Sequence, residues 1–333
     1  MKSDSNSQPS PQNERATNAA TLELTFAAAM WGFGFVGVVW ALRYLGPFGV
    51  TGWRFALAFV VGSVVIAVLP GLRKQVNLRE FKLAFWPGIF LAGTLVLQTW
   101  GLKYTTATKS GFLTTLYVLV VPLLDMFILK RKAPRFHLIY VALALLGVAL
   151  ICDLPQMMFN SFTVSPVDTG SVAVTSVEAL ARTRWNIGDW LTLACMLAAS
   201  LQIFWFGVIQ KKITSSFNFN VYQTFWAGLI PLPLALWLEP LPTSLPHGEP
   251  LIGILMISFG STLIAFALQV RAQKVISPSL ASLLYLLESP FAAIFAFILL
   301  GERFTTQGSL GAALILVALG SSVVFTKEKE LVT

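Results

Sequence analysis

Long apolar runs are the feature that most restricts how this chain can fold. A helix of about 20 apolar residues crosses the roughly 30 Å hydrocarbon core of a lipid bilayer. Only 11% of the residues are charged, whereas about a quarter are charged in ordinary soluble domains. Apolar runs of this kind cover residues 22–42, 48–69, 83–102, 110–129, 137–151, 187–209, 219–238, 251–270, 279–300 and 307–325. The sequence therefore predicts an all-α polytopic membrane protein with ten transmembrane helices.

The segments outside the runs divide the chain further. Residues 1–21 are rich in Ser, Asn and Gln and are predicted to form a disordered cytoplasmic tail. Two five-helix units follow, over residues 22–152 and 187–326, and residues 327–333 form a second cytoplasmic tail. The long connection, residues 153–186, is expected on the outside of the membrane. It is either a disordered linker or a small ordered cap.

Basic residues set the expected orientation in the membrane. With the N-terminus in the cytoplasm, most of the 23 Lys and Arg residues fall in cytoplasmic segments, as is typical of membrane proteins. This distribution predicts a multi-pass protein of the inner or plasma membrane with both termini in the cytoplasm. The basic residues form small clusters between apolar runs and no continuous basic face, which argues against binding to nucleic acid.

The two halves of the chain resemble each other when they are aligned with an offset of 168 residues. Tyr117 then matches Tyr285, and Pro122 matches Pro290. Because each half has an odd number of runs, the second copy is expected to enter the membrane from the opposite face. Such inverted repeats place the solute site near the middle of the bilayer, between the two copies.

One carboxylate, Glu288, lies near the middle of the run 279–300. A charged group at this depth is costly and usually faces a bundle interior or a wet cavity. Glu288 is either a partner for a proton or a substrate amine, or a structural carboxylate held by hydrogen bonds across the bundle. Pro290 removes a helix donor and leaves the Leu286 carbonyl free, so a bend is expected there. Glu288, Pro122 and Pro290 are therefore the expected coupling or gating positions.

Short motifs add a resemblance to a known family. Trp31-Gly32-Phe33-Gly34-Phe35 lies in the first run, and Pro47 is followed by Trp53-Arg54-Phe55 in the second. Leu287-Glu288-Ser289-Pro290 and Gly301-Glu302-Arg303 belong to the ninth. The pattern resembles the EamA-type ten-span permeases of the drug/metabolite transporter superfamily. This resemblance implies a secondary transporter that exports small metabolites, such as amino acids or related compounds, by alternating access through a cavity.

Aromatic and amide side chains near mid-depth are the expected lining of a solute site. Aromatic walls with a few polar groups suit a small amphipathic or aromatic solute. The alternative for any one of these aromatic residues is ordinary packing. The candidates for substrate binding are Trp31, Gln98, Tyr117, Gln202, Trp205, Tyr285 and Glu288.

Three further charged residues are expected to have structural roles. Arg54 lies inside the second run, where its long side chain could reach the interface or an acid such as Glu302. Asp125 is close enough to the basic residues after the fourth run to extend toward them. Glu302 lies at the end of the ninth run, where solvation or pairing explains it.

The sequence offers no catalytic residues, cofactor site or metal site. No phosphate-binding loop or dinucleotide motif is present, and there are only two histidines. The expected partners are a small-molecule solute and the lipid bilayer, with monomer and homodimer both open. Two alternatives remain. A nucleotide-sugar or sugar-phosphate exchanger would need several basic residues at mid-depth, and a polytopic membrane enzyme would need clustered His, Asp or Ser residues.

Overall fold

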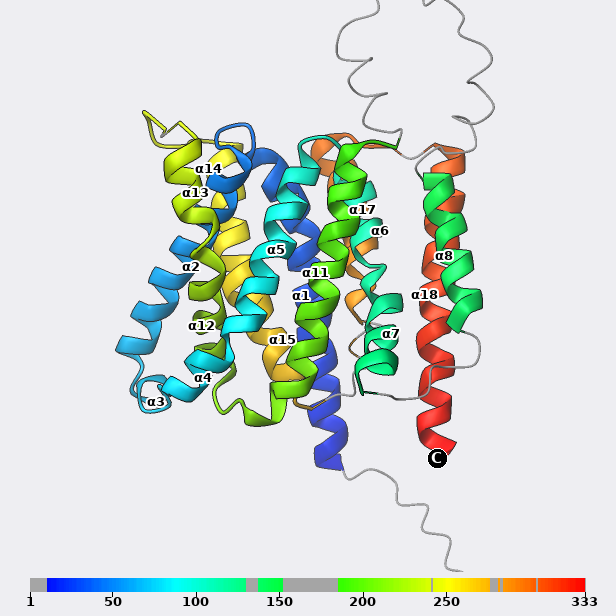
Figure 1. The fold of residues 1–333 in the computed structure, drawn as a ribbon, viewed down its shortest axis with the longest axis horizontal. Helices are drawn as coiled ribbons and strands as arrows, with labels where there is room; N and C mark the ends of the chain where they lie inside the picture. The colour runs from blue at the N-terminus through cyan, green and yellow to red at the C-terminus, as the bar shows by residue number, and fades with distance from the viewer. Residues whose placement is uncertain are drawn as a thin grey trace, which may run out of the picture.

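The protein is a bundle of helices that run up and down through its long dimension (Figure 1). The computed structural model describes residues 11–129, 137–151, 185–240, 242–275, 281, 284–303 and 305–332. Within these residues every regular element is a helix. The all-α prediction is therefore confirmed.

The first half of the chain begins with the longest helix of the bundle and ends beside the last one. Its helices are α1 (Pro11–Ala41), α2 (Pro47–Val68), α3 (Pro70–Arg73), α4 (Leu78–Leu83), α5 (Phe85–Leu102), α6 (Ala107–Thr114), α7 (Tyr117–Leu129) and α8 (His137–Ile151).

The second half contains one stretch of unusual backbone, the π-helix η2. Its helices are α11 (Ile187–Ile209), the 3-10 turn η1 (Gln210–Lys212), α12 (Ser216–Gly228), α13 (Pro231–Leu238), α14 (Glu249–Leu255), η2 (Met256–Ala265), α15 (Phe266–Ala272), α17 (Glu288–Leu300) and α18 (Thr306–Val332).

Helices of membrane-spanning character occupy the positions of the predicted runs. Seven helical stretches in the described residues are long and apolar enough to cross a membrane. Three shorter apolar helices, Ala142–Ile151, Glu288–Leu300 and Thr306–Ala318, lie in the remaining runs. The chain is thus a polytopic membrane protein, and the number of ten crossings stays a prediction.

Both predicted tails contain helix, which corrects their predicted extent. α1 already begins at Pro11, so residues 11–21 extend the first helix. Proline is favourable at the start of a helix because its φ angle is already helical, and Thr21 donates a 2.8 Å hydrogen bond to the Thr17 carbonyl within this extension. α18 likewise continues through the second predicted tail as far as Val332. The predicted external loop lies almost entirely outside the described residues.

The ninth span starts a new helix at Glu288, which corrects the expected bend at Pro290. Pro290 lies in the first turn of α17, where a helix has backbone N–H groups without an internal partner. A proline there costs no helix hydrogen bond. The Leu286 carbonyl, expected to be free, accepts a 3.3 Å hydrogen bond from the Ser289 N–H.

The fourth span has a related interruption, between α6 and α7, with Pro122 inside α7. The Leu119 N–H donates to the Leu116 carbonyl oxygen at 2.9 Å. At the matched positions of the second half, the Leu287 N–H donates to the Leu284 carbonyl oxygen at 3.2 Å. Both bonds join residues three apart, which is the pattern of a tightened turn. The two halves therefore share a backbone feature as well as a sequence pattern.

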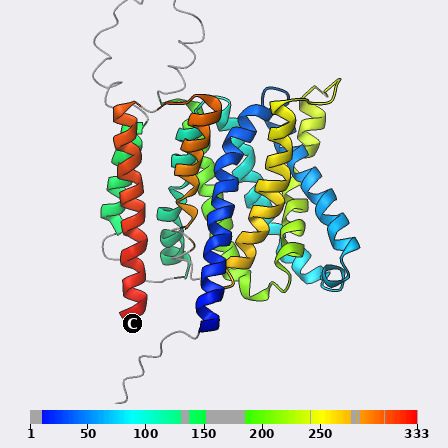
Figure 2. The ribbon, with the colours of Figure 1, turned by 180° about the vertical axis from the view of Figure 1, so that it is seen from behind.

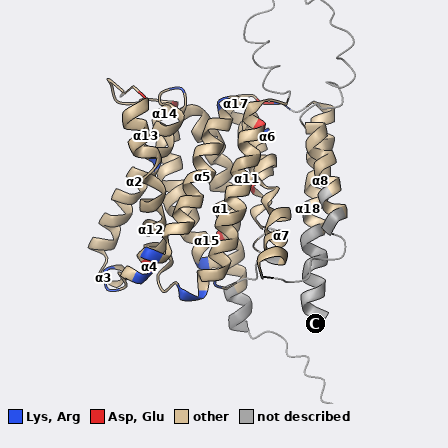
Figure 3. Ribbon diagram, in the orientation of Figure 1, with Lys and Arg blue, Asp and Glu red and all other residues tan. Residues whose placement is uncertain are grey.

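The two ends of the bundle differ in charge (Figure 3). We call the end with α3, α4 and the last turn of α15 the basic end, since Arg73, Lys82 and Arg271 lie there. We call the opposite end, which carries Glu239 and Glu302, the capped end. α1 runs from the basic end to the capped end, and α11 runs the opposite way (Figures 1 and 2). This is the relation that an inverted repeat requires.

Small residues allow close helix contacts. α8 packs along α18 at one side of the bundle, and a methyl group added at Gly147 would lie only 2.7 Å from the Gly311 carbonyl oxygen. α5 packs along α11 in the same way, with an added methyl at Gly188 lying 2.5 Å from the Gly101 carbonyl oxygen. Glycine is the residue that permits such backbone approach within a membrane.

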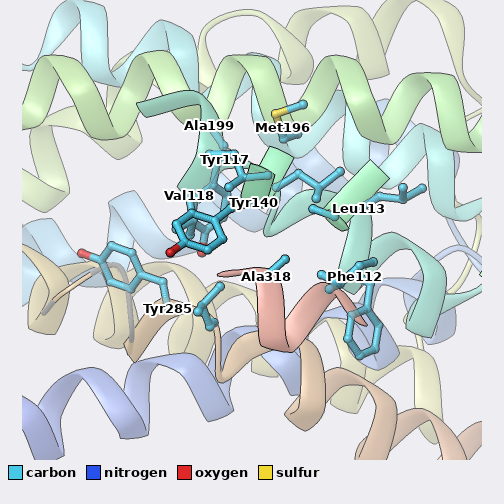
Figure 4. Packing of buried hydrophobic residues seen from close by; sticks show 14 of the residues in the cluster. Phe112, Leu113, Tyr117, Val118, Tyr140, Met196, Ala199, Tyr285 and Ala318 are labelled. Atoms are coloured by element: carbon cyan, nitrogen blue, oxygen red, sulfur yellow. The ribbon is translucent and has the colours of Figure 1, made fainter. Parts of the chain in front are cut away.

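A buried cluster joins the two halves near the middle of the bundle (Figure 4). It includes Phe112 and Tyr117 from the first half and Met196, Ala199 and Tyr285 from the second. All of these side chains are less than 10% exposed. The cluster holds the interrupted fourth and ninth spans against α11, beside the site described next.

Candidate functional site

A cavity lies inside the bundle. Residues of both halves line it, from α1, α2, α5, α6, α7, α11, η2, α15 and α17. Sites for small molecules are usually concave, often lie between the helices of a bundle, and combine apolar walls with a few polar groups. The cavity is therefore the candidate solute site.

Six of the seven predicted binding residues line this cavity. They are Trp31, Gln98, Tyr117, Gln202, Tyr285 and Glu288. The exception is Trp205, which lies nearly one turn closer to the basic end than Gln202. Its ring packs against Trp86, with 6.3 Å between the ring centres, and it borders the buried cluster around Phe206. Trp205 is thus a packing residue in this structure.

Aromatic rings form a continuous wall. The ring centre of Trp31 lies 5.2 Å from that of Phe266 and 5.7 Å from that of Tyr285. Tyr285 in turn lies 6.4 Å from Tyr117, edge to face. These distances are typical of favourable aromatic pairs. The wall joins residues of both halves, so movement of one half against the other would change its shape.

Glu288 places its carboxylate at the cavity wall and at the start of a helix. Its side chain is buried, and the Tyr117 hydroxyl donates a 3.4 Å hydrogen bond to Oε2. The first turn of α17 points its backbone N–H groups toward this end, which favours a negative charge there. The start of a helix at Glu288 therefore favours a carboxylate at this position.

Arg54 also lines the cavity, which corrects its expected contacts. Its Nε donates to the Thr262 hydroxyl at 2.5 Å, and its Nη2 donates to the Ser261 hydroxyl at 2.7 Å. It makes no ion pair with Glu302 and does not reach the surface, being 3% exposed. The sequence could not show these contacts, because Ser261 and Thr262 lie more than 200 residues from Arg54 along the chain.

The π-helix η2 creates the Arg54 site. Thr262 donates from its hydroxyl to the Ile257 carbonyl at 2.7 Å, five residues back, which is the spacing of a π-helix. Carbonyl groups of η2 also accept from neighbouring helices, as when the Trp31 indole donates to the Ser261 carbonyl at 3.2 Å. Asn220 donates to the Thr262 carbonyl at 3.1 Å. π-Helical turns are rare in proteins overall, but those that do occur are often found at functional sites.

A basic and an acidic side chain therefore share one buried chamber. Arg54 and Glu288 come from different halves, and both line the cavity. A guanidinium group binds carboxylates through directed hydrogen bonds, and a carboxylate binds an ammonium group. The pair can hold a solute that carries both charges.

Glu302 and Glu239 bind the starts of two other helices. Glu302 accepts hydrogen bonds from the backbone N–H groups of Ala107 and Thr108, at 2.8 and 3.0 Å, at the start of α6. Glu239 accepts from Phe48 and Gly49, at 2.8 and 2.7 Å, at the start of α2. A carboxylate at a helix N-terminus pairs with the dipole and with N–H groups that lack partners. These two residues give the capped end its name.

A buried ion pair at the capped end was not predicted from the sequence. The Lys109 ammonium lies 2.8 Å from Asp189 Oδ2, and the two side chains are 4% and 0% exposed. Asp189 also accepts hydrogen bonds from the Thr105 hydroxyl and the Asn186 N–H. The available signal was a Lys and an Asp near the beginnings of two apolar runs.

The remaining predicted residues lie elsewhere. Pro122 and Pro290 are not among the described residues that line the cavity. The side chain of Asp125 lies outside the described part of the structure. The roles assigned to these residues stay predictions.

Comparison with known proteins agrees with the geometry. A solved crystal structure of another protein superposes on 94% of this chain and 99% of its own, with a TM-score of 0.61 at 17% sequence identity. This match shows that the fold is shared. An uncharacterized transporter of Archaeoglobus fulgidus is 28% identical over 303 residues, which covers 90% of this chain and 84% of that relative.

A second relative and a family model extend the agreement. The uncharacterized transporter YetK of Bacillus subtilis is 23% identical over 283 residues, covering 82% of this chain and 78% of YetK. The model of the EamA-like transporter family matches residues 20–152 and 186–324, one match in each half. These relatives are named as transporters, and none as an enzyme. The chain therefore belongs to the EamA-like transporter family of multi-pass membrane proteins.

Proposed function

We propose that this protein is a secondary transporter that exports amino acids or related small metabolites by alternating access, with Glu288 exchanging a proton. The observation that carries the proposal is the placement of Arg54 and Glu288 on the wall of one buried cavity. The charges of a zwitterionic solute match this pair, with its carboxylate at Arg54 and its ammonium group at Glu288.

The rest of the cavity supports a solute of modest size and mixed polarity. The aromatic wall suits an apolar side chain, and the amides of Gln98 and Gln202 add hydrogen-bonding groups. Among the described residues that line the cavity, Arg54 is the one cationic side chain. A nucleotide sugar or sugar phosphate would call for several, so that alternative has less support.

Alternating access would use the interruptions in the fourth and ninth spans. These breaks lie at matched places in the two halves, and each faces the central cavity through Tyr117 or Tyr285. Rocking about such positions would expose the cavity to each side of the membrane in turn. A proton taken up by Glu288 from one side and released to the other would couple this movement to a gradient.

The proposed direction of transport rests on the family resemblance, and the proposed orientation in the membrane rests on the distribution of basic residues. Positively charged loops favour the cytoplasm, so we place the basic end there, with both chain termini in the cytoplasm of a plasma-membrane protein. Export then means movement from the basic end toward the capped end. The family resemblance supports export of a metabolite.

Counterflow in proteoliposomes tests the proposal. Liposomes that contain the purified protein would be loaded with one unlabelled L-amino acid at a time, and uptake of the labelled compound would be measured with and without a pH gradient. We expect exchange for a subset of amino acids and faster net uptake with the gradient. No exchange of any amino acid above empty liposomes would contradict the substrate class.

Two variants separate the roles of the charges. Glu288→Gln should abolish the response to the pH gradient, whereas Glu249→Gln, which changes an exposed acid of the capped end, should keep it. Arg54→Gln should weaken binding of an amino acid at least about 10-fold relative to the amine that lacks its carboxylate, because a charged hydrogen bond is lost. A Glu288→Gln variant with an unchanged gradient response would remove proton exchange at this residue.

A further inference from the structure

Two buried polar groups in the cavity lack a hydrogen bond of normal geometry among the described residues, although the Gln269 side chain lies close enough to the Tyr285 hydroxyl to interact with it. They are the side-chain carbonyl oxygen of Gln269 and the hydroxyl of Tyr285. Gln269 is 3% exposed and Tyr285 is 2% exposed, and both line the cavity. Burying such groups without hydrogen bonds is unfavourable. A polar group that enters with the solute would satisfy them.

These two groups lie apart from the charged pair. Gln269 follows Ser261, a partner of Arg54, by eight residues in the same span. This spacing places it roughly 10 Å nearer the basic end, because half of the stretch belongs to the π-helix η2, which rises less per residue than the about 1.5 Å of an α-helix. The Tyr285 hydroxyl points away from the buried cluster that contains Tyr117 (Figure 4). The cavity thus has a charged part and a separate uncharged polar part, with the rings of Trp31 and Phe266 beside them.

The chemistry of the two groups defines what they can bind. The Gln269 carbonyl oxygen accepts a hydrogen bond, and the Tyr285 hydroxyl can donate one. A primary amide offers one donor and one acceptor in the complementary arrangement, and a hydroxyl group offers both on one atom. A purely aliphatic or thioether group offers no N–H or O–H donor and would leave the Gln269 oxygen unpaired.

We propose that Gln269 and Tyr285 form a polar subsite that selects solutes with an amide or hydroxyl group at the end remote from the charged groups. This inference rests on the proposed function and narrows its substrate class to polar amino acids. Gln269 is then a residue that determines specificity, and Arg54 with Glu288 binds the part that all amino acids share.

Binding of amino acids that are nearly equal in shape tests the subsite. The purified full-length protein would be titrated with L-glutamine and L-methionine, and with L-5-hydroxynorvaline and L-norleucine, by calorimetry. We expect the polar member of each pair to bind about 10-fold or more tightly, the effect of one or two hydrogen bonds. Gln269→Met should reduce this ratio to about 2-fold or less by weakening binding of the polar member alone. Tyr285→Phe should reduce it in part.

A matched variant and a second measurement keep the result interpretable. Gln273→Met changes the same residue type one turn further along, outside the cavity lining, and should keep the parent ratio. Removing an unpaired buried carbonyl should leave the melting temperature of solute-free Gln269→Met unchanged or higher. A clear fall would show that Gln269 is a structural residue and would overturn the proposal.

The remaining outcomes are distinct. If both members of each pair bind equally to the parent protein, or if Gln269→Met keeps the ratio, the subsite is wrong while amino-acid binding stands. If no amino acid binds or exchanges, the proposed substrate class and the subsite fall together.

Discussion

The capped end and the basic end of the bundle are built from repeated halves, yet different contacts hold them together. At the capped end, Glu239 and Glu302 bind the starts of α2 and α6, and Lys109 pairs with Asp189 in a fully buried setting. At the basic end, Glu80 binds one backbone N–H, that of Thr214, at 2.9 Å. The comparison teaches that two repeated halves can supply similar scaffolds while individual side chains hold the two ends of the bundle in different ways.

Close glycine contacts occur toward both ends, since near the basic end a methyl group added at Gly88 would lie 2.8 Å from the Gln223 carbonyl oxygen. Gly253 lies so close to α1 that an added methyl group would be 2.4 Å from the Gly37 carbonyl oxygen. Gly101 and Gly188 form a similar contact between α5 and α11, also toward the capped end. Near the basic end of α11, by contrast, Gly207 has no atom within 4 Å of an added methyl group.

The buried ion pair should give the largest effect. Asp189→Leu leaves the Lys109 ammonium buried without its charge partner, which typically costs about 3–5 kcal/mol. Unfolding of the purified protein in detergent micelles would measure the loss. Glu249→Leu removes a partner from the exposed Arg43 pair at the same end and should cost at most about 1 kcal/mol. Equal losses in the two variants would contradict the distinction between the pairs.

Glycine substitutions compare two ends of one helix. Gly188→Ala forces a methyl group against the Gly101 carbonyl oxygen and should cost about 1–3 kcal/mol, as overpacking usually does. Gly207→Ala meets open space and should be neutral or stabilise by up to about 1 kcal/mol. The melting temperatures of both variants check this. A larger loss for Gly207→Ala would show that Gly207 is the more tightly packed of the two glycines.

Removal of a helix-binding carboxylate should loosen the capped end locally. Glu302→Ala leaves the N–H groups of Ala107 and Thr108 without their acceptor, at a cost of about 1 kcal/mol. Hydrogen exchange in the peptide that contains these residues should become about 5-fold faster. Glu249→Ala, which removes an exposed acid that pairs with Arg43, serves as the control. Unchanged exchange in Glu302→Ala would mean that other contacts hold α6.

The smallest expected change concerns a lysine of the basic end. Partial burial lowers the pKa of Lys274 from its usual value, and the charge of Glu80 opposes this by favouring the ammonium form. Glu80→Gln should therefore lower the pKa of Lys274 further, so its amine becomes neutral and reactive at a lower pH. Amine labelling followed by mass spectrometry across a pH series would detect the shift. A shift to higher pH would contradict the role assigned to Glu80.

Most of the fold followed from the sequence because bilayer length and hydropathy fix where helices lie. Six residues of the cavity lining were also predictable, since mid-depth aromatic, amide and acidic groups in a membrane protein tend to face its interior. Trp205 was expected to line the cavity and does not, because hydropathy does not tell which face of a helix meets the cavity.

The remaining features depend on contacts between distant segments. The partners of Arg54 lie in η2, and a π-helix has no clear sequence signal. Pro290 indicated correctly that the ninth span is interrupted nearby. However, the effect of proline on a helix does not by itself distinguish a bend within a helix from the start of a new helix. The Lys109 and Asp189 pair required knowledge that α6 and α11 are neighbours at the capped end.

The π-helix makes the solute site sensitive to a residue count. A π-helical turn spans one residue more than an α-helical turn, so deleting one residue between Met256 and Ala265 would tighten η2 toward an α-helix. Ser261 and Thr262 would then shift relative to Arg54, although no side chain of the chamber had been replaced. Shortening this span by one residue would change how the site binds its solute, although every side chain that contacts the solute would still be present.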